Sequence, residues 1–112
     1  MQEQNIFNNI LRGSTVVLEH YAEKRALYEN LQDMTKPVLA QCVAQFTGSE
    51  AKKEKLAMAD DVYLQHLDAV SIARRDYHMA WAKYENLKTQ LAVAQSLNKI
   101  KVVEMKSNTF KT

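Results

Sequence analysis

Basic and aromatic side chains alternate along the second half of the chain, and together they could bind a polyanion. They are Arg74, Arg75, Trp81, Lys83 and Lys88. Cations pair with phosphates and an aromatic ring can stack on an unpaired base, so this pattern is typical of a contact with single-stranded DNA. The same pattern also fits a solvated helix face that binds nothing, and both interpretations stay open here.

No residues have the spacing of a catalytic or metal site. His20, His66 and His78 lie far apart in the sequence, and no cysteine or carboxylate completes a tetrahedral site with any of them. Gly-rich phosphate loops and nucleophile motifs are absent from the sequence. The sequence therefore predicts a protein that is not an enzyme and has no metal, no cofactor and no small-molecule substrate.

The composition favours a few long helices. Only two of the 112 residues are glycine and one is proline, so turns are rare. No apolar run could span a membrane, and the first residues do not resemble a signal peptide. The single cysteine, Cys42, fits a reducing compartment and lies among apolar positions, as a small buried side chain would. We expect a cytosolic protein.

An amphipathic helix is predicted over residues 60–107. Large side chains recur every seventh residue, and most positions three residues further on are small: Tyr63, Val70, Tyr77, Tyr84, Leu91, Asn98 and Met105, then His66, Ala73, Ala80, Leu87, Ala94 and Lys101. Such a stripe packs closely against a neighbouring helix. At about 1.5 Å per residue, the helix would be on the order of 65–70 Å long, too long for a compact domain of this mass.

The rest of the chain supplies the neighbour. A first helix is expected over residues 14–47, with a kink or short break at Pro37, which lacks a backbone donor. Gly48 and Ser49 suit a turn and a helix cap, and a short helix follows over residues 50–59. The predicted fold is all-α: residues 14–112 form an antiparallel, coiled-coil-like helical hairpin with a bent first helix and a long second one.

Residues 1–13 are predicted to be an N-terminal arm, because Gly13 breaks the helical pattern and Ser14 or Thr15 could cap a new helix. Its apolar residues, on one side of about two turns, are Ile6, Phe7, Ile10 and Leu11. The arm could fold onto the protein's own core or act as a hydrophobic peptide that docks on another chain.

The end of the long helix lacks a partner within the hairpin unless this arm covers it. Apolar residues between Leu91 and Met105 would then stay in water, so we expect a homo-oligomer. Residues 1–69 carry seven basic and ten acidic side chains, and residues 70–112 carry eight and three. The two halves could attract each other, or the basic half could face an acidic partner or nucleic acid.

Several stretches also resemble a family of small helical proteins from tailed phages, prophages and integrative elements. They span residues 48–54, 57–67, 80–88 and 91–98: a Gly-Ser turn, a charged helix, a Tyr followed by His-Leu, and a long helix ending near Ser-Leu-Asn. The resemblance covers residues 45–105. Relatives commonly have Trp-Arg where this chain has Ala94 and Gln95, so a partner contact through that pair would be altered or lost.

Genes of this family often lie beside recombination genes. The resemblance therefore implies a non-catalytic accessory of phage or mobile-element DNA recombination or replication, in the cytoplasm of a bacterial host. Such a protein would bind a recombination protein, single-stranded DNA, or both. The alternative is a phage interaction protein that inhibits or recruits a host factor through its helical surface. No functional residue is transferred from the family.

Overall fold

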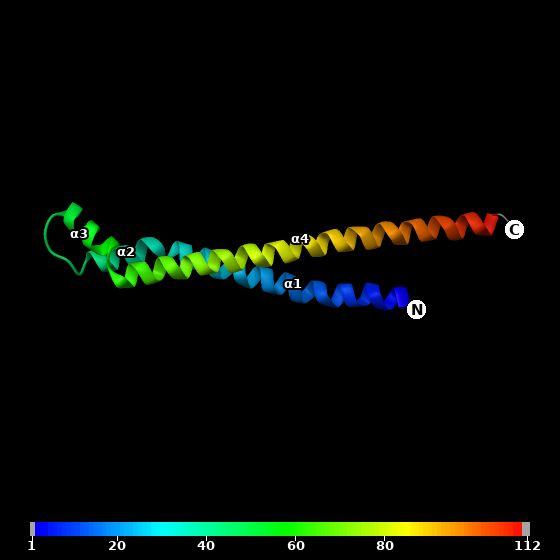
Figure 1. Ribbon diagram of the computed structural model, residues 1–112, viewed down its shortest axis with the longest axis horizontal. Helices are drawn as coiled ribbons and strands as arrows, with labels where there is room; N and C mark the ends of the chain where they lie inside the picture. The colour runs from blue at the N-terminus through cyan, green and yellow to red at the C-terminus, as the bar shows by residue number, and fades with distance from the viewer. Residues whose placement is uncertain (1, 111–112) are drawn as a thin grey trace.

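The computed structural model describes residues 2–110. Within this range it describes the side chains of residues 8, 9 and 12–105. The helices are α1 (Gln2–Asp33), α2 (Thr35–Val43), α3 (Glu50–Met58) and α4 (Asp61–Phe110). Helices α1 and α2 run antiparallel to α4, and α3 lies at the closed end of the hairpin (Figure 1). The predicted all-α hairpin, with a bent first helix and a long last helix, is confirmed.

The molecule is a rod. Its extents are 91 × 21 × 14 Å and its radius of gyration is 25.1 Å, whereas a compact domain of 100 residues has a radius of gyration of about 13 Å. A pair of helices in contact can bury only one side of each, so most side chains stay exposed. None of the helices, over the part that is described, is long and apolar enough to cross a membrane.

The core is a narrow seam between the two arms. Six apolar residues are buried among those described: Cys42, Ala57, Val70, Ala73, Ala80 and Leu87. Four of these belong to the stripe predicted for the long helix, and its tyrosines are half-buried. Burial ends after Ala94, so the predicted stripe packs over its first two thirds only.

The predicted break at Gly13 is wrong, because α1 continues through it from Gln2 to Asp33. Residues 2–13, which were predicted as an N-terminal arm, are thus continuous with the helix that follows them. A glycine inside a helix costs only about 0.5–1 kcal/mol relative to alanine, and residues 2–33 contain no proline to stop the helix. The side chains of Ile6, Phe7, Ile10 and Leu11 lie outside the described residues, so their predicted docking role is not tested.

The interruption expected at Pro37 occurs at Met34, between α1 and α2. Pro37 has no N–H for the carbonyl of Asp33 one turn earlier, whereas the amides of Met34 and Val38 keep their helical bonds to Asn30 and Met34. The missing bond thus falls around Met34 and bends the arm there. The arm predicted over residues 14–47 with a kink or short break thus consists of the end of α1 and of α2, which ends at Val43.

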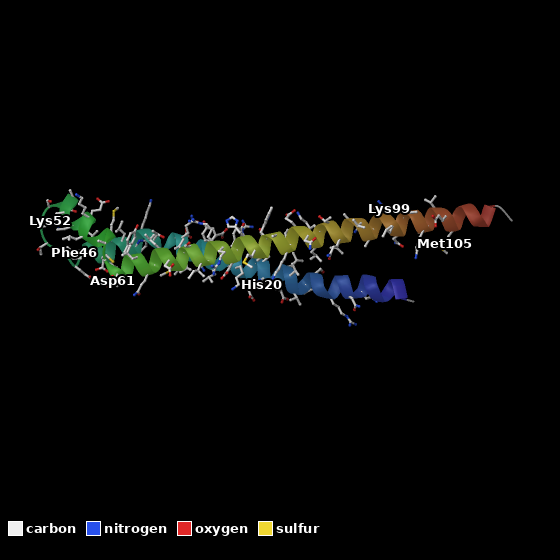
Figure 2. The ribbon with its side chains drawn as sticks, viewed as in Figure 1. His20, Phe46, Lys52, Asp61, Lys99 and Met105 are labelled. Atoms are coloured by element: carbon white, nitrogen blue, oxygen red, sulfur yellow. The ribbon has the colours of Figure 1, made fainter. Side chains whose placement is uncertain are left out.

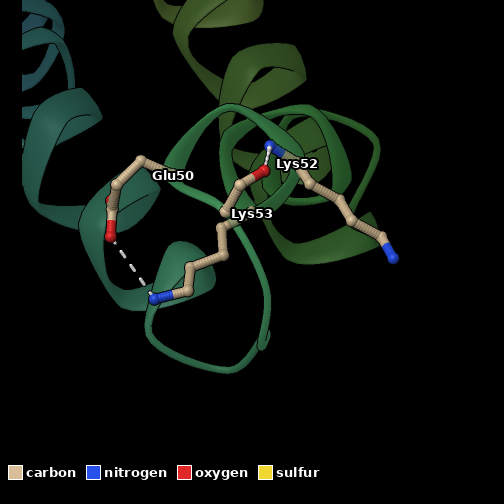
Figure 3. Close-up of polar contacts among 4 residues, drawn as sticks. Glu50, Lys52 and Lys53 are labelled. Carbon is tan, nitrogen blue, oxygen red and sulfur yellow. Dashed lines mark hydrogen bonds and ion pairs between the residues drawn. The ribbon is translucent and has the colours of Figure 1, made fainter.

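The turn at the closed end follows the predicted chemistry. Gly48 has φ +119°, which side chains rarely adopt. The Ser49 hydroxyl accepts a bond from the Lys52 amide (3.3 Å) and caps α3, while Glu50 and Lys53 pair at 3.4 Å (Figure 3). This turn reverses the chain within a few residues.

Asp60 joins the start of α4 to the bent arm. One carboxylate oxygen of Asp60 accepts a bond from the Val62 amide (2.9 Å) and a longer one from the Cys42 thiol (3.8 Å). Burial first, then the charge of Asp60, raises the pKa of the thiol. Cys42 therefore stays protonated at neutral pH and acts as a packing residue, because the nucleophile would be the thiolate.

The small residues of the seam generate a test. We expect Ala80→Leu to lower the free energy of unfolding by about 1–3 kcal/mol, because Ala80 is only 2% exposed and the added atoms would push α1 away. Ala82→Leu is the matched control, since Ala82 is exposed two residues further along the same helix. Urea denaturation followed by circular dichroism would measure both, and equal midpoints would contradict the seam.

Candidate functional site

The five residues predicted to contact DNA do not form one surface. An α-helix turns by about 100° per residue, so Arg74, Trp81 and Lys88, spaced by seven, lie on one side of α4. Arg75 points away from α1, and Lys83 lies on the opposite flank of the seam. The structure thus brings three of the five together. Trp81 is 46% exposed, as expected for an aromatic residue off the packing stripe.

A stack of four tyrosines, two from each arm, joins α1 to α4. The ring centroids of Tyr28 and Tyr77 are 5.6 Å apart, those of Tyr77 and Tyr21 are 5.8 Å apart, and those of Tyr21 and Tyr84 are 5.0 Å apart. The planes lie within 29° of parallel. Rings at these separations attract each other beyond the area they bury. The stack therefore fixes which turn of α1 faces which turn of α4.

Two of the residues predicted to contact DNA, Arg74 and Lys88, lie at the two ends of this stack. Arg74 lies 5.7 Å from the ring centroid of Tyr28, and its Nε donates to the Tyr28 hydroxyl at 3.2 Å. Lys88 lies 5.0 Å from the ring centroid of Tyr84 and pairs with Glu85 at 2.9 Å. The carboxylate of Glu85 raises the pKa of Lys88. Both Arg74 and Lys88 therefore already have partners within the hairpin.

The spacing of the tyrosines in the sequence is a signal for this stack. Tyr21 and Tyr28 are seven residues apart, as are Tyr77 and Tyr84. Tyr77 and Tyr84 belong to the stripe predicted for the long helix, but which residues of the first helix face them depends on the turn between the two helices. A bond from Tyr21, and then burial, raises the pKa of Tyr77, so its hydroxyl stays neutral within the seam.

The histidines do not assemble a metal site. Among the described residues, no three His, Cys, Asp or Glu side chains are close enough to hold a metal ion. The Nε2 atom of His66 lies 2.9 Å from the Thr35 hydroxyl, and the ring of His78 meets Tyr77 edge-on at 5.5 Å. His20 is exposed on α1. His66 therefore has a contact across the hairpin, whereas His78 is exposed and meets the ring of its sequence neighbour.

The open end of the hairpin exposes apolar side chains of α4, among them Val102 at 44% and Met105 at 69%. Figure 1 shows α1 diverging from α4 toward its N-terminus, and α4 continuing past it. Every described residue of α4 from Gln95 to Met105 is exposed. Figure 2 shows Lys99 level with the end of α1 and Met105 beyond it. We call the inner side of α4 here, facing the diverging α1, the fork surface. It includes Leu91, Ala94, Val102 and Met105.

Comparison with known protein families, characterised proteins and solved structures found no match.

The adjacent arginines test the stack. We expect Arg74→Ala to lower the free energy of unfolding by about 1 kcal/mol, because it removes a cation–π contact and a hydrogen bond across the hairpin. Arg75→Ala should change it by less than about 0.5 kcal/mol, since Arg75 is exposed and points away from α1. Urea titrations of both variants measure the difference, and equal effects would contradict the assigned contacts.

The raised pKa of Tyr77 predicts a loss of stability at alkaline pH. The unfolded chain loses the tyrosine proton near pH 10, before the folded chain does, so above that pH the unfolded state binds fewer protons and stability falls. Tyr77→Phe removes the ionising group. Between pH 9 and pH 11, its melting temperature should therefore fall less than that of the parent chain, as thermal circular dichroism would measure. Parallel declines would show that Tyr77 does not contribute.

Proposed function

We propose that this protein is a non-catalytic accessory that binds a partner protein at the fork surface. The observation that carries this proposal is the exposed apolar end of α4, which the diverging α1 leaves uncovered. An exposed apolar helix side of this kind fits contact with an amphipathic segment of the partner, which would lay its apolar side along α4.

The charged residues beside the fork surface indicate which kind of partner would bind there. Lys99 and Lys101 flank the fork surface, while Glu104 is the only acidic residue between Gln95 and Met105. An acidic, amphipathic helix would therefore meet both the apolar positions and the lysines. The alternation of charge and apolar groups would set its orientation, while the apolar positions Val102 and Met105 would supply most of the affinity.

Single-stranded DNA is less well supported as the direct ligand. Two of the cations proposed to contact phosphates, Arg74 and Lys88, contact tyrosines at the seam. Arg75 and Lys83 project from other sides of α4, so one strand could not follow all four. A DNA contact would require the first two to leave the tyrosine stack.

The process in which this accessory acts is inferred from the family resemblance alone. Small phage and mobile-element proteins encoded beside recombination genes suggest a partner in DNA recombination or replication. A bacterial host factor is the other candidate, and its chemistry at the fork surface would be the same. Lysates with and without the phage genes distinguish these two sources.

The test compares capture by full-length protein with capture by a fork variant, Val102→Glu with Met105→Glu. We expect the parent chain to retain one partner at both low and high salt, because an apolar contact is weakly screened. The fork variant should lose that partner, because two buried carboxylates cost far more than the apolar contacts they replace. Mass spectrometry identifies the protein, and purified partner then gives its dissociation constant by calorimetry.

A second double variant, Leu67→Glu with Ala92→Glu, adds the same charge at exposed positions of α4 outside the fork surface. It should bind the partner like the parent chain. Fluorescence anisotropy with a labelled oligothymidine tests the competing ligand. Tight binding whose logarithm falls by about 0.7 per phosphate contact with log salt, abolished by Arg74→Ala and Lys88→Ala, would overturn the proposal in favour of DNA.

A further inference from the structure

The side of α4 that faces away from α1 carries a second stripe with heptad spacing. Its members at every seventh position are Ile72, Met79, Asn86, Val93 and Ile100, and those three residues further on are Arg75, Ala82, Thr89, Ser96 and Val103. All ten are exposed, with Ile72 at 45%, Met79 at 57%, Val93 at 53% and Ile100 at 54%. We call these ten residues the outer stripe.

Four of the five sevenfold positions carry apolar side chains that are β-branched or long. A helix side that faces only water has no need of such a repeat. The hairpin buries its opposite side, through Ala73 and Ala80. A repeat of this kind is the pattern by which one helix packs along another, with side chains fitting between those of the facing helix. The described hairpin leaves this repeat without a facing helix.

We propose that the outer stripe pairs with the outer stripe of a second copy of this chain, with the two α4 helices antiparallel. In antiparallel order, sevenfold positions of one helix face the three-further positions of the other. Ile72 then meets Val103 of the second copy, and Val93 meets Ala82. Met79 likewise meets Ser96, so in two layers a small side chain lies opposite a larger one, which gives close packing without overlap.

The polar residues of the outer stripe also pair in this order. Asn86 faces Thr89 of the second copy, and the two-fold axis repeats the pair. The Thr89 hydroxyl donates to the Glu85 carbonyl of its own helix at 3.1 Å, so its oxygen can still accept from the Asn86 amide. A polar pair at the centre of an apolar seam specifies register at some cost in stability.

Charge separates the antiparallel order from the parallel one. A parallel pair would place Arg75 directly opposite Arg75 of the second copy, so two like charges would share one layer of the interface. In antiparallel order Arg75 lies beside Ile100 of the second copy, one turn from Glu104, and Asp76 lies near Lys101.

The size of the outer stripe suits a stable pair. From Ile72 to Val103 it runs for about 47 Å, and with a width of roughly 10 Å it covers on the order of 1,000 Å² over two copies. That is about the minimum for a specific interface. The fork surface lies on the other side of α4, so this pairing stands independently of the proposed function.

Sedimentation equilibrium of the full chain at tens of micromolar tests the pair. We expect a dimer for the parent chain and for the charge-matched control Leu67→Glu with Ala92→Glu. Met79→Glu with Val93→Glu should weaken dimerisation by at least about tenfold, because each substitution buries a carboxylate in the interface between the two copies. Circular dichroism confirms that the hairpin is intact, since both positions are exposed in the single chain. A monomeric parent, or equal effects of the two double variants, would overturn the proposal.

Cysteine cross-linking tests the direction. In a Cys42→Ser background, chains carrying Ala82→Cys are mixed with chains carrying Val93→Cys and oxidised mildly. The antiparallel pair brings these two positions within disulfide range, so the mixed dimer should form far faster than either self-linked dimer. Predominant self-linking of the Val93→Cys chain would indicate a parallel pair and overturn the antiparallel order. Absence of any cross-link in a chain that sediments as a dimer would exclude the outer stripe as the interface.

Discussion

The close approach of two long helices is the constraint on which the rest of this structure depends. Ala73 and Ala80 are almost fully buried, so the backbones can approach closely enough for tyrosines of both arms to stack. Sevenfold spacing alone would permit a slip of one heptad along the seam. The stack is bounded, because Tyr28 and Tyr84 have cations on their outer faces. A slip would leave a ring unpaired and a cation without its ring.

Polar contacts towards the closed end fix the same alignment independently. The Thr35 hydroxyl donates to the Leu31 carbonyl and also meets His66 across the hairpin. Near the turn, Asp60 caps α4 and accepts from Cys42. These groups lie close to the place where Pro37 leaves a carbonyl without its helical donor. The bend therefore occurs within the best-anchored part of the rod, and the least-anchored part is the open fork.

Much of the fold could be predicted because it depends on local chemistry and on one period. The inner stripe, the turn at Gly48 and the caps at Ser49 and Asp60 follow from residue type and spacing. The continuity of α1 through Gly13 could not, since a glycine only lowers helical stability and the rest of a long helix can offset it. The roles of Arg74 and Lys88 were missed for another reason. Their partners are determined by the facing helix, which periodicity within one helix does not reveal.

The two sides of α4 would divide self-association from partner binding. A straight helix holds the outer stripe and the fork surface about half a turn apart, so a ligand on one does not block the other. In the antiparallel pair, the two fork surfaces would face away from the two-fold axis, one towards each end of the rod. Such a dimer could hold two partner molecules at a fixed separation, or bind one partner that presents two acidic helices. In the second case the linked contacts would raise affinity without any new interaction. A long exposed helix is thus better suited to bringing partners together than to enclosing a substrate.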